Sequence, residues 1–189
     1  MVFQERLYTA EEFYEFVNRP ENKDKWYELY RGVIYEAIMP SPIHAIISLL
    51  IAKVISDFVT KYNLGHVVGD VCHFYLPNGD TFIPDTAFVS KERQPTIPPK
   101  FELAPDLAVE IVSPSNRPHE ILDKVESYIE CGTKLVWVVY PDDKVVDVWS
   151  PVEGGGQRKR KLDINGVLDG EDVLPGFKLP VRQIFEQQS

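Results

Sequence analysis

The amino-acid sequence predicts an α/β (α+β) fold with a central mixed sheet flanked by helices and with additional antiparallel β-ribbons. One observation is a long stretch, 43–62, with apolar residues at the three-and-four spacing of a helix. A second is the order strand, helix, strand over 107–139, which predicts a crossover between two parallel strands. The third is a set of short β-prone segments near both ends of the chain, separated by turn residues, which predicts ribbons.

A single domain is expected over residues 1–189. The hydrophobic share of 44% is ample for one core in a chain of 189 residues. We expect an N-terminal helix and β-ribbon over 1–40, a core over 41–150 and a C-terminal β-ribbon extension over 151–189.

The N-terminal elements follow from local signals. Thr9 with Glu12 three residues later forms the pattern of a capping box, which predicts a short helix ending before Pro20. The β-rich segment 27–35 has Gly32 in its middle, which predicts either two short strands turning at Arg31 and Gly32 or a bulged ribbon.

The long helix over 43–62 is expected to bury a broad apolar stripe. This stripe consists of Ile46, Ile47, Leu50, Ile51, Val54, Ile55, Phe58 and Val59. The segments 67–76 and 82–89 then read as two strands joined by the turn residues 77–80.

The middle of the chain continues with a buried strand over 107–112. Ser115 or Asn116 can cap a helix over 117–131 that ends at Gly132, and an apolar strand follows over 135–139. The segment 145–149 is expected to pair with this strand across a short turn.

One basic run, residues 158–161, follows three glycines and precedes Asn165 and Gly166. We expect the edge of a β-ribbon here, paired with 166–174 across a turn at Asn165 and Gly166. The run is either a solvated edge or a local basic surface for a polyanion. The net charge of −9 weakly disfavours nucleic acid as a partner but does not exclude such a surface.

Other classes of protein are disfavoured. No apolar run is expected to approach the roughly 20 residues that cross a bilayer, and residues 1–6 are too polar to begin a secretory signal, so a cytoplasmic protein without membrane contact is expected. Cys72 and Cys131 have neither metal-ligand spacing nor the density of a disulfide framework. His66, His73 and His119 lack the mutual spacing of zinc ligands. The triple glycine at 154–156 lacks the lysine and helix that follow a nucleotide-binding loop.

Two acidic residues interrupt apolar, β-prone segments. Asp85 lies in 83–89 and Glu110 in 105–112. A charge in such a segment is costly unless it meets a metal ion, a proton or a cation, so both residues indicate chemistry. Lys124, on the following predicted helix, offers a cation.

The ordered set of these features resembles the restriction endonuclease-like PD-(D/E)XK superfamily, and within it the Uma-type family of endonucleases, over roughly residues 7–177. The resemblance lies in Tyr27-Glu28-Leu29, Gly32, 42–44, Pro84-Asp85, 104–115, Lys124, Tyr128, Gly132 and 136–139. It implies a restriction endonuclease-like core, with Asp85 and Glu110 as ligands of Mg²⁺, or of Mn²⁺ as a possible substitute.

The lysine of the superfamily motif normally stands two residues after the second acid, where this chain has Val112. The resemblance implies that Lys124 replaces it from the next helix, its long side chain reaching the strand ends. The alternative is an exposed lysine paired with Glu120 or Tyr128.

Further residues match the family pattern, each with a plain alternative. Glu28 is an additional metal or water ligand, or an exposed ribbon carboxylate. His44 contacts phosphate or water, or is a solvated residue near a helix start. Asp106 supports the site or caps its strand.

The remaining candidates concern substrate binding. Ser113 and Ser115 either hold a phosphate or set up the helix cap. Arg158 and Lys159 are the candidates for substrate contact in the basic run.

The resulting hypothesis is a Mg²⁺-dependent endonuclease, a hydrolase acting on phosphodiester bonds of DNA, which the resemblance implies to be a homodimer. One alternative is a catalytically weakened nuclease-fold module that binds nucleic acid or a partner without cutting, as Val112 and the acidic charge would allow. Another is a metal-dependent hydrolase of a small phosphate ester, because the acids specify the metal better than the substrate.

Overall fold

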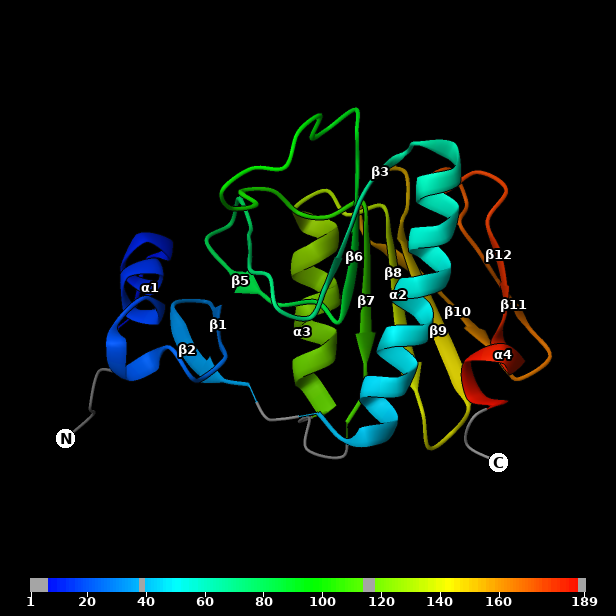
Figure 1. The fold of residues 1–189 in the computed structure, drawn as a ribbon, viewed down its shortest axis with the longest axis horizontal. Coiled ribbons are helices and arrows are strands. Elements are labelled where there is room, and N and C mark those ends of the chain that lie inside the picture. The colour runs from blue at the N-terminus through cyan, green and yellow to red at the C-terminus, as the bar shows by residue number, and fades with distance from the viewer. Residues whose placement is uncertain (1–6, 38–39, 114–117, 187–189) are drawn as a thin grey trace.

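A computed structural model describes residues 7–37, 40–113 and 118–186 (Figure 1). Its helices are α1 (Ala10–Val17), the 3₁₀ helix η1 (Pro20–Asn22), α2 (Pro42–Tyr62), α3 (Pro118–Glu130) and α4 (Val181–Phe185). Its strands are β1 (Tyr27–Tyr30), β2 (Val33–Glu36), β3 (Gly65–Gly69), β4 (Phe74–Tyr75), β5 (Thr81–Phe82), β6 (Thr86–Ser90), β7 (Leu107–Ile111), β8 (Leu135–Tyr140), β9 (Val145–Pro151), β10 (Gln157–Leu162), β11 (Val167–Asp169) and β12 (Lys178–Pro180).

The largest sheet has the order β10-β9-β8-β7-β6-β3. Strands β7 and β8 are parallel and are joined by α3, as the predicted crossover requires, whereas the other neighbouring pairs are antiparallel. The sheet is therefore mixed, and helices lie against it in Figure 1. This confirms the predicted fold class.

The two faces of this sheet carry separate hydrophobic clusters. On β7, Leu107, Val109 and Ile111 pack with α2, whereas Ala108 belongs to the cluster of α3. Because side chains alternate between the faces of a strand, Glu110 points to the same side as Ala108. The period of the strand thus directs this carboxylate toward α3.

A second sheet, with the order β2-β1-β5-β4, joins the N-terminal ribbon to two short strands from the middle of the chain. Thr9 and Glu12 make the predicted capping box at the start of α1. Arg31 (φ 49°) and Gly32 (φ 79°) turn β1 into β2, so the two-strand alternative is correct.

The predicted strands 67–76 and 82–89 are wrong in one respect, because each divides between the two sheets. The first supplies β3 and β4, and the second supplies β5 and β6. Pro84 explains the second division, since it has no N–H with which to continue the ladder. Asp85 lies at this crossing, directly before β6.

The C-terminal ribbon also differs from the prediction. Strand β10 pairs with β9, and β11 pairs with β12, so the expected pairing of the basic run with 166–174 is wrong. Gly154, Gly155 and Gly156 have φ values of 88°, 100° and 87°, which favours the reversal between β9 and β10 at this point. The predicted division of the chain into a core and two extensions stays a prediction.

Helix α2 departs from the sequence expectation in two ways. Ile46 is 42% exposed rather than part of the buried stripe, which Ile47, Ile51 and Ile55 form. By length and composition α2 is also apolar enough to cross a membrane, which corrects the expectation that no segment approaches that length. One such helix is weak evidence of a membrane span because core helices of soluble proteins pass the same test, and α2 packs against the large sheet.

Candidate active site

A cleft of about 320 Å³ lies where the N-terminal ribbon, α2, α3 and the end of β7 meet. The structure brings most of the candidate residues into its lining. These are Glu28, His44, Asp85, Glu110, Ser113 and Lys124.

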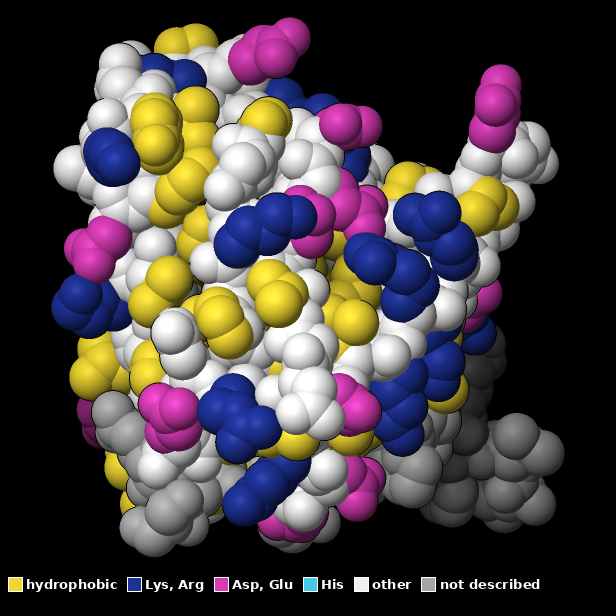
Figure 2. All heavy atoms as spheres, turned by 90° about the vertical axis from the view of Figure 1, so that its right-hand side faces the viewer, with side chains coloured by type: hydrophobic (Ala, Val, Ile, Leu, Met, Phe, Trp, Pro, Cys, Tyr) yellow, Lys and Arg dark blue, Asp and Glu magenta, His cyan; other side chains and the backbone are white. Residues whose placement is uncertain are grey.

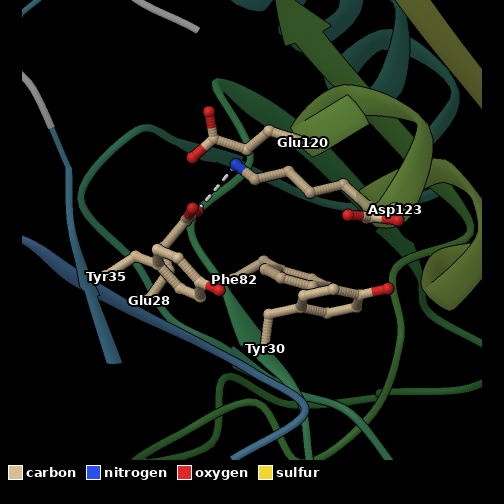
Figure 3. A pocket seen from close by; sticks show the side chains of 7 residues that line it. Glu28, Tyr30, Tyr35, Phe82, Glu120 and Asp123 are labelled. Carbon is tan, nitrogen blue, oxygen red and sulfur yellow. Dashed lines mark hydrogen bonds and ion pairs between the residues drawn. The ribbon is translucent and has the colours of Figure 1, made fainter. Parts of the chain in front are cut away.

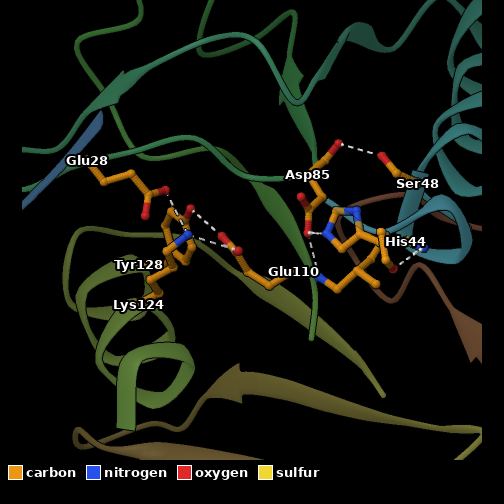
Figure 4. A network of polar contacts seen from close by, with 9 residues as sticks. Glu28, His44, Ser48, Asp85, Glu110, Lys124 and Tyr128 are labelled. Carbon is orange, nitrogen blue, oxygen red and sulfur yellow. Dashed lines mark hydrogen bonds and ion pairs between the residues drawn. The ribbon is translucent and has the colours of Figure 1, made fainter. Parts of the chain in front are cut away.

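Lys124 is the central cation of the cleft. Its Nζ atom lies 2.7 Å from Glu28 Oε1 and 3.1 Å from Glu110 Oε2 (Figure 4). The lysine is 9% exposed, so the alternative of an exposed lysine is wrong. A buried ammonium with two carboxylate partners satisfies the rule that buried charges are paired.

Tyr128 lies one helical turn after Lys124 and donates a hydrogen bond of 2.8 Å from its hydroxyl to Glu110 Oε1. From the sequence, Tyr128 was part of the family resemblance and an alternative partner of the lysine, with no role assigned beside Glu110. The four-residue spacing was the available signal, because it puts both side chains on one face of α3. Burial, with the neighbouring Glu110 charge, raises the pKa of Tyr128 well above its ordinary value, so the hydroxyl stays a donor.

The electrostatics of Glu110 are those of a carboxylate in a crowded, buried position. Burial raises its pKa to about 8, an effect that Lys124 opposes and that Asp85 and Glu28 increase. Burial alone would lower the pKa of Lys124, but Glu110 and Glu28 outweigh it and raise that pKa. The lysine is therefore charged, and Glu110 readily takes up a proton when no further cation is present.

Asp85 is held from three sides. Its Oδ2 atom lies 3.2 Å from His44 Nε2 and accepts a 2.6 Å hydrogen bond from the Ile111 amide, while Ser48 Oγ donates to its backbone oxygen at 3.1 Å. Burial lowers the pKa of His44, but the hydrogen bond and charge of Asp85 prevail and raise it. Sequence reasoning missed Ser48, which lies one turn after His44 in a pattern that otherwise indicated only a buried helix face.

Glu28 connects the N-terminal ribbon to this site. Besides its contact with Lys124, its Oε1 atom accepts a 2.8 Å hydrogen bond from the Ile83 amide. Its side chain is only 12% exposed, so the exposed ribbon carboxylate is the wrong alternative.

Asp106 lies at the opposite end of β7 from Glu110. It accepts a 2.8 Å hydrogen bond from the Ser90 amide and lies 3.3 Å from Arg93 and 3.6 Å from Lys134. These contacts correspond to the alternative in which Asp106 caps its strand.

The basic run lies away from the cleft lining, on the exposed edge strand β10. Arg158 donates to Ser150 at 3.2 Å, and Lys159 to Asp147 at 3.3 Å. On this side of the molecule Lys and Arg side chains alternate with Asp and Glu (Figure 2). Arg158 and Lys159 are thus not brought together with Asp85 and Glu110 of the cleft. Ser115 lies outside the described residues.

The side chains of Cys72, Cys131, His66 and His73 do not line the cleft, and that of His119 lies outside the described residues. Cys72 and Cys131 are free thiols. His66 contacts the Gln94 carbonyl at 3.1 Å, and His73 contacts the Tyr27 carbonyl at 2.9 Å.

The donor chemistry of the cleft fits a hard divalent cation. Asp85 and Glu110 offer oxygen ligands on a cleft with room for water, and Mg²⁺ is commonly held by one or two carboxylates with several waters. Within residues 7–37, 40–113 and 118–186, no group of three or more His, Cys, Asp and Glu side chains is close enough to hold a metal ion. The two carboxylates point to different partners, Asp85 to His44 and Glu110 to Lys124 (Figure 4).

The mixed sheet and a cleft that combines carboxylates with a buried lysine are the features expected of the restriction endonuclease-like class. The fold matches the crystal structure of "a putative nuclease belonging to DUF820 from Anabaena variabilis ATCC 29413", with a TM-score of 0.81, 22% identity, and coverage of 94% of this chain and 97% of that chain.

The model of the Uma2 family, described as "Putative restriction endonuclease", matches residues 10–182. The chain belongs to the Uma2 family. No curated protein matches it. Family membership supports a nuclease function in general terms.

Proposed function

We propose that this protein is a metal-dependent endonuclease that hydrolyses phosphodiester bonds in DNA. The observation that carries the proposal is the ammonium of Lys124, which lies between Glu28 and Glu110 in the cleft that Asp85 also lines. An amine beside two acids suits hydrolysis of a phosphate diester, because the acids can hold a metal ion and the amine can offset charge on the phosphate.

Asp85 and Glu110 are the residues that would hold the cation, Mg²⁺ or in its place Mn²⁺. When bound, such an ion polarises a phosphoryl oxygen and lowers the pKa of a bound water. The carboxylates of Glu28, Asp85 and Glu110 outnumber the ammonium of Lys124, so a divalent cation would balance their charge and favour the ionised form of Glu110.

The protein's own groups then divide the remaining tasks. Lys124 orients the attacking water and offsets negative charge that develops on the phosphate. Glu28 holds the ammonium, while His44 and the Ile111 amide hold the carboxylate of Asp85. The position of Lys124 supports its acting in place of the motif lysine, whose usual position is occupied by Val112. No covalent protein intermediate is required.

The test is cleavage of supercoiled plasmid and of single-stranded DNA with Mg²⁺, with and without a chelator, by the parent protein and by Asp85→Asn. We expect cleavage of at least one of these DNAs, only with metal ion, and loss of at least about 100-fold in the variant. Cleavage that survives the chelator, or equal cleavage by Asp85→Asn, would overturn the proposal. Hydrolysis of small phosphate esters but of no DNA would favour the alternative hydrolase.

We also propose a cytoplasmic homodimer, the assembly that the family resemblance implies. Light scattering on the purified protein should give twice the mass of the 21.7 kDa chain. A monomer at all micromolar concentrations would contradict the dimer and leave the chemistry of the cleft unaffected.

A further inference from the structure

One wall of the cleft is built from the N-terminal ribbon and carries aromatic rings. Trp26 and Tyr35 both line the cleft beside Glu28. Tyr35 is paired directly with Glu28, and the Ala37 amide bonds to the Trp26 carbonyl, which extends the ladder by one pair. Directly opposed residues of an antiparallel pair share a face, and alternate residues of one strand do too, so Trp26, Glu28 and Tyr35 point to the same side.

These rings are exposed, whereas the opposite face of β1 is packed. Trp26 is 47% exposed and Tyr35 37% exposed. Tyr27 and Leu29, which point the other way, are buried against Phe13 of α1. The ribbon therefore has a separate core of its own, and its aromatic face toward the cleft is left uncovered.

A small recess of about 30 Å³ continues this wall. Tyr30, Tyr35 and Phe82 line it, and the acids Glu120 and Asp123 lie at its edge (Figure 3). Glu28 and Lys124 line both the recess and the cleft. The recess thus opens beside the proposed reacting groups.

The charges of the cleft argue against binding through phosphate contacts. Its lining holds more acids than cations. The acids are Glu28, Glu36, Asp70, Asp85, Glu110 and Glu120, against Lys124 and, when protonated, His44. A polyanion gains little from such a surface beyond what a bound metal ion supplies, so affinity has to come from another source. Aromatic rings supply it by stacking on bases, which costs least where the bases are unpaired and their faces are open.

We propose that the ribbon face of Trp26 and Tyr35 is a stacking platform for unpaired nucleobases, so that the substrate class of the cleft is single-stranded DNA rather than intact duplex. This inference rests on the proposed nuclease function. A base stacked on Trp26 or Tyr35 would lead its backbone along the wall toward Glu28 and Lys124, because these residues line the same cleft.

Binding and cleavage are measured separately. A fluorescent 12-nucleotide single strand and the matching duplex are titrated with the protein in Ca²⁺, and the same DNAs are cut in Mg²⁺. The single strand should bind at least about 10-fold more tightly than the duplex, and Trp26→Ala and Tyr35→Ala should each weaken its binding about 10-fold. Tyr62→Ala is the control, since Tyr62 is 53% exposed on α2 and lies outside the cleft lining.

Tryptophan fluorescence provides a second readout. Trp137 is fully buried and Trp149 half-buried, so Trp26 is the exposed tryptophan. The single strand should quench the fluorescence of the parent protein, and Trp26→Phe should bind nearly as well with the quenching lost. Melting temperatures verify that each variant is folded.

The inference is overturned if the parent binds duplex as tightly as single strand, or if folded Trp26→Ala and Tyr35→Ala bind like the parent. Equal cutting of both DNAs by the parent, unchanged in the two variants, would remove the stacking platform and leave the nuclease function standing. Selective binding of single strands without cutting of any DNA would remove the nuclease function and leave the stacking platform standing.

Discussion

The ammonium of Lys124 lies 3.1 Å from Glu110 Oε2 although 14 residues separate the two in the chain. The cause is the crossover from β7 through α3 to β8, which lays the helix back over the strand that it follows. Helix α3 thereby supplies an amine to the end of β7, where Val112 occupies the usual position of the motif lysine.

Replacing Lys124 with methionine should destabilise the fold strongly. The change leaves Glu28 and Glu110 without their buried cation, and removal of one partner from a buried pair costs about 3–5 kcal/mol. Urea unfolding at pH 8.5 measures the loss. Lys134→Met is the matched control, because that lysine is 60% exposed and its pair with Asp106 contributes at most about 1 kcal/mol. Equal stability of the two variants would contradict the buried pair.

Replacing Tyr128 with phenylalanine should cost about 1–3 kcal/mol, since Glu110 Oε1 loses a buried hydrogen-bond donor. The pKa of Glu110 should rise further, because the tyrosine hydrogen bond lowers it. Unfolding followed across pH checks both effects. Tyr27→Phe is the control, since its hydroxyl makes a longer bond of 3.4 Å to Asn22. An unchanged pH profile in Tyr128→Phe would show that the hydroxyl does not act on Glu110.

The stability of the metal-free protein should fall as pH rises from about 4.5 to 8. Burial raises the pKa of Glu110 from 4.5 to about 8, so within this window the folded state binds a proton that the unfolded chain has released. Lys124 does not contribute there, because its raised pKa keeps it protonated in both states. Melting temperatures across pH should therefore decline for the parent and stay flatter for Glu110→Gln. Glu102→Gln, at an exposed carboxylate, should behave like the parent, and parallel curves for all three would refute the assignment.

Replacing Asp106 with asparagine should reduce stability but not cleavage. The carboxylate holds the Ser90 amide and the cation of Arg93 at the end of β7 away from Glu110, so its loss should cost about 1–3 kcal/mol. Nuclease activity measured well below the melting temperature should equal that of the parent. Loss of activity as large as in Asp85→Asn, with the fold intact, would make Asp106 part of the site.

The parts of the fold and site that depend on local signals, or on the residue pattern within one strand, could be predicted from the sequence. Thr9 with Glu12 gave the start of α1, and the apolar runs around α3 gave the parallel pair of β7 and β8. An isolated acid in an apolar segment identified both Asp85 and Glu110, because such a charge requires a partner in any fold. Glu28 and His44, and the role of Lys124 as the replacement of the motif lysine, came from the ordered resemblance.

The rest depended on contacts between distant segments. Pro84 marks a break in strand 82–89, yet only the packed structure decides that the two halves join different sheets. The partner of β10 was similarly open, since turn signals flank it on both sides. The role of Ser48 in binding the backbone of Asp85 and the exposure of Ile46 follow from how α2 sits on the sheet, which helical spacing alone does not determine.

The central claim is that Asp85 and Glu110 jointly hold one divalent cation beside Lys124. Calorimetric titration of Mn²⁺ into the parent, Asp85→Asn, Glu110→Gln and the control Asp106→Asn tests it most directly. We expect one binding event in the parent and in Asp106→Asn, and affinity at least about 10-fold weaker in each of the other two. Unchanged Mn²⁺ binding by Asp85→Asn and by Glu110→Gln would contradict the account.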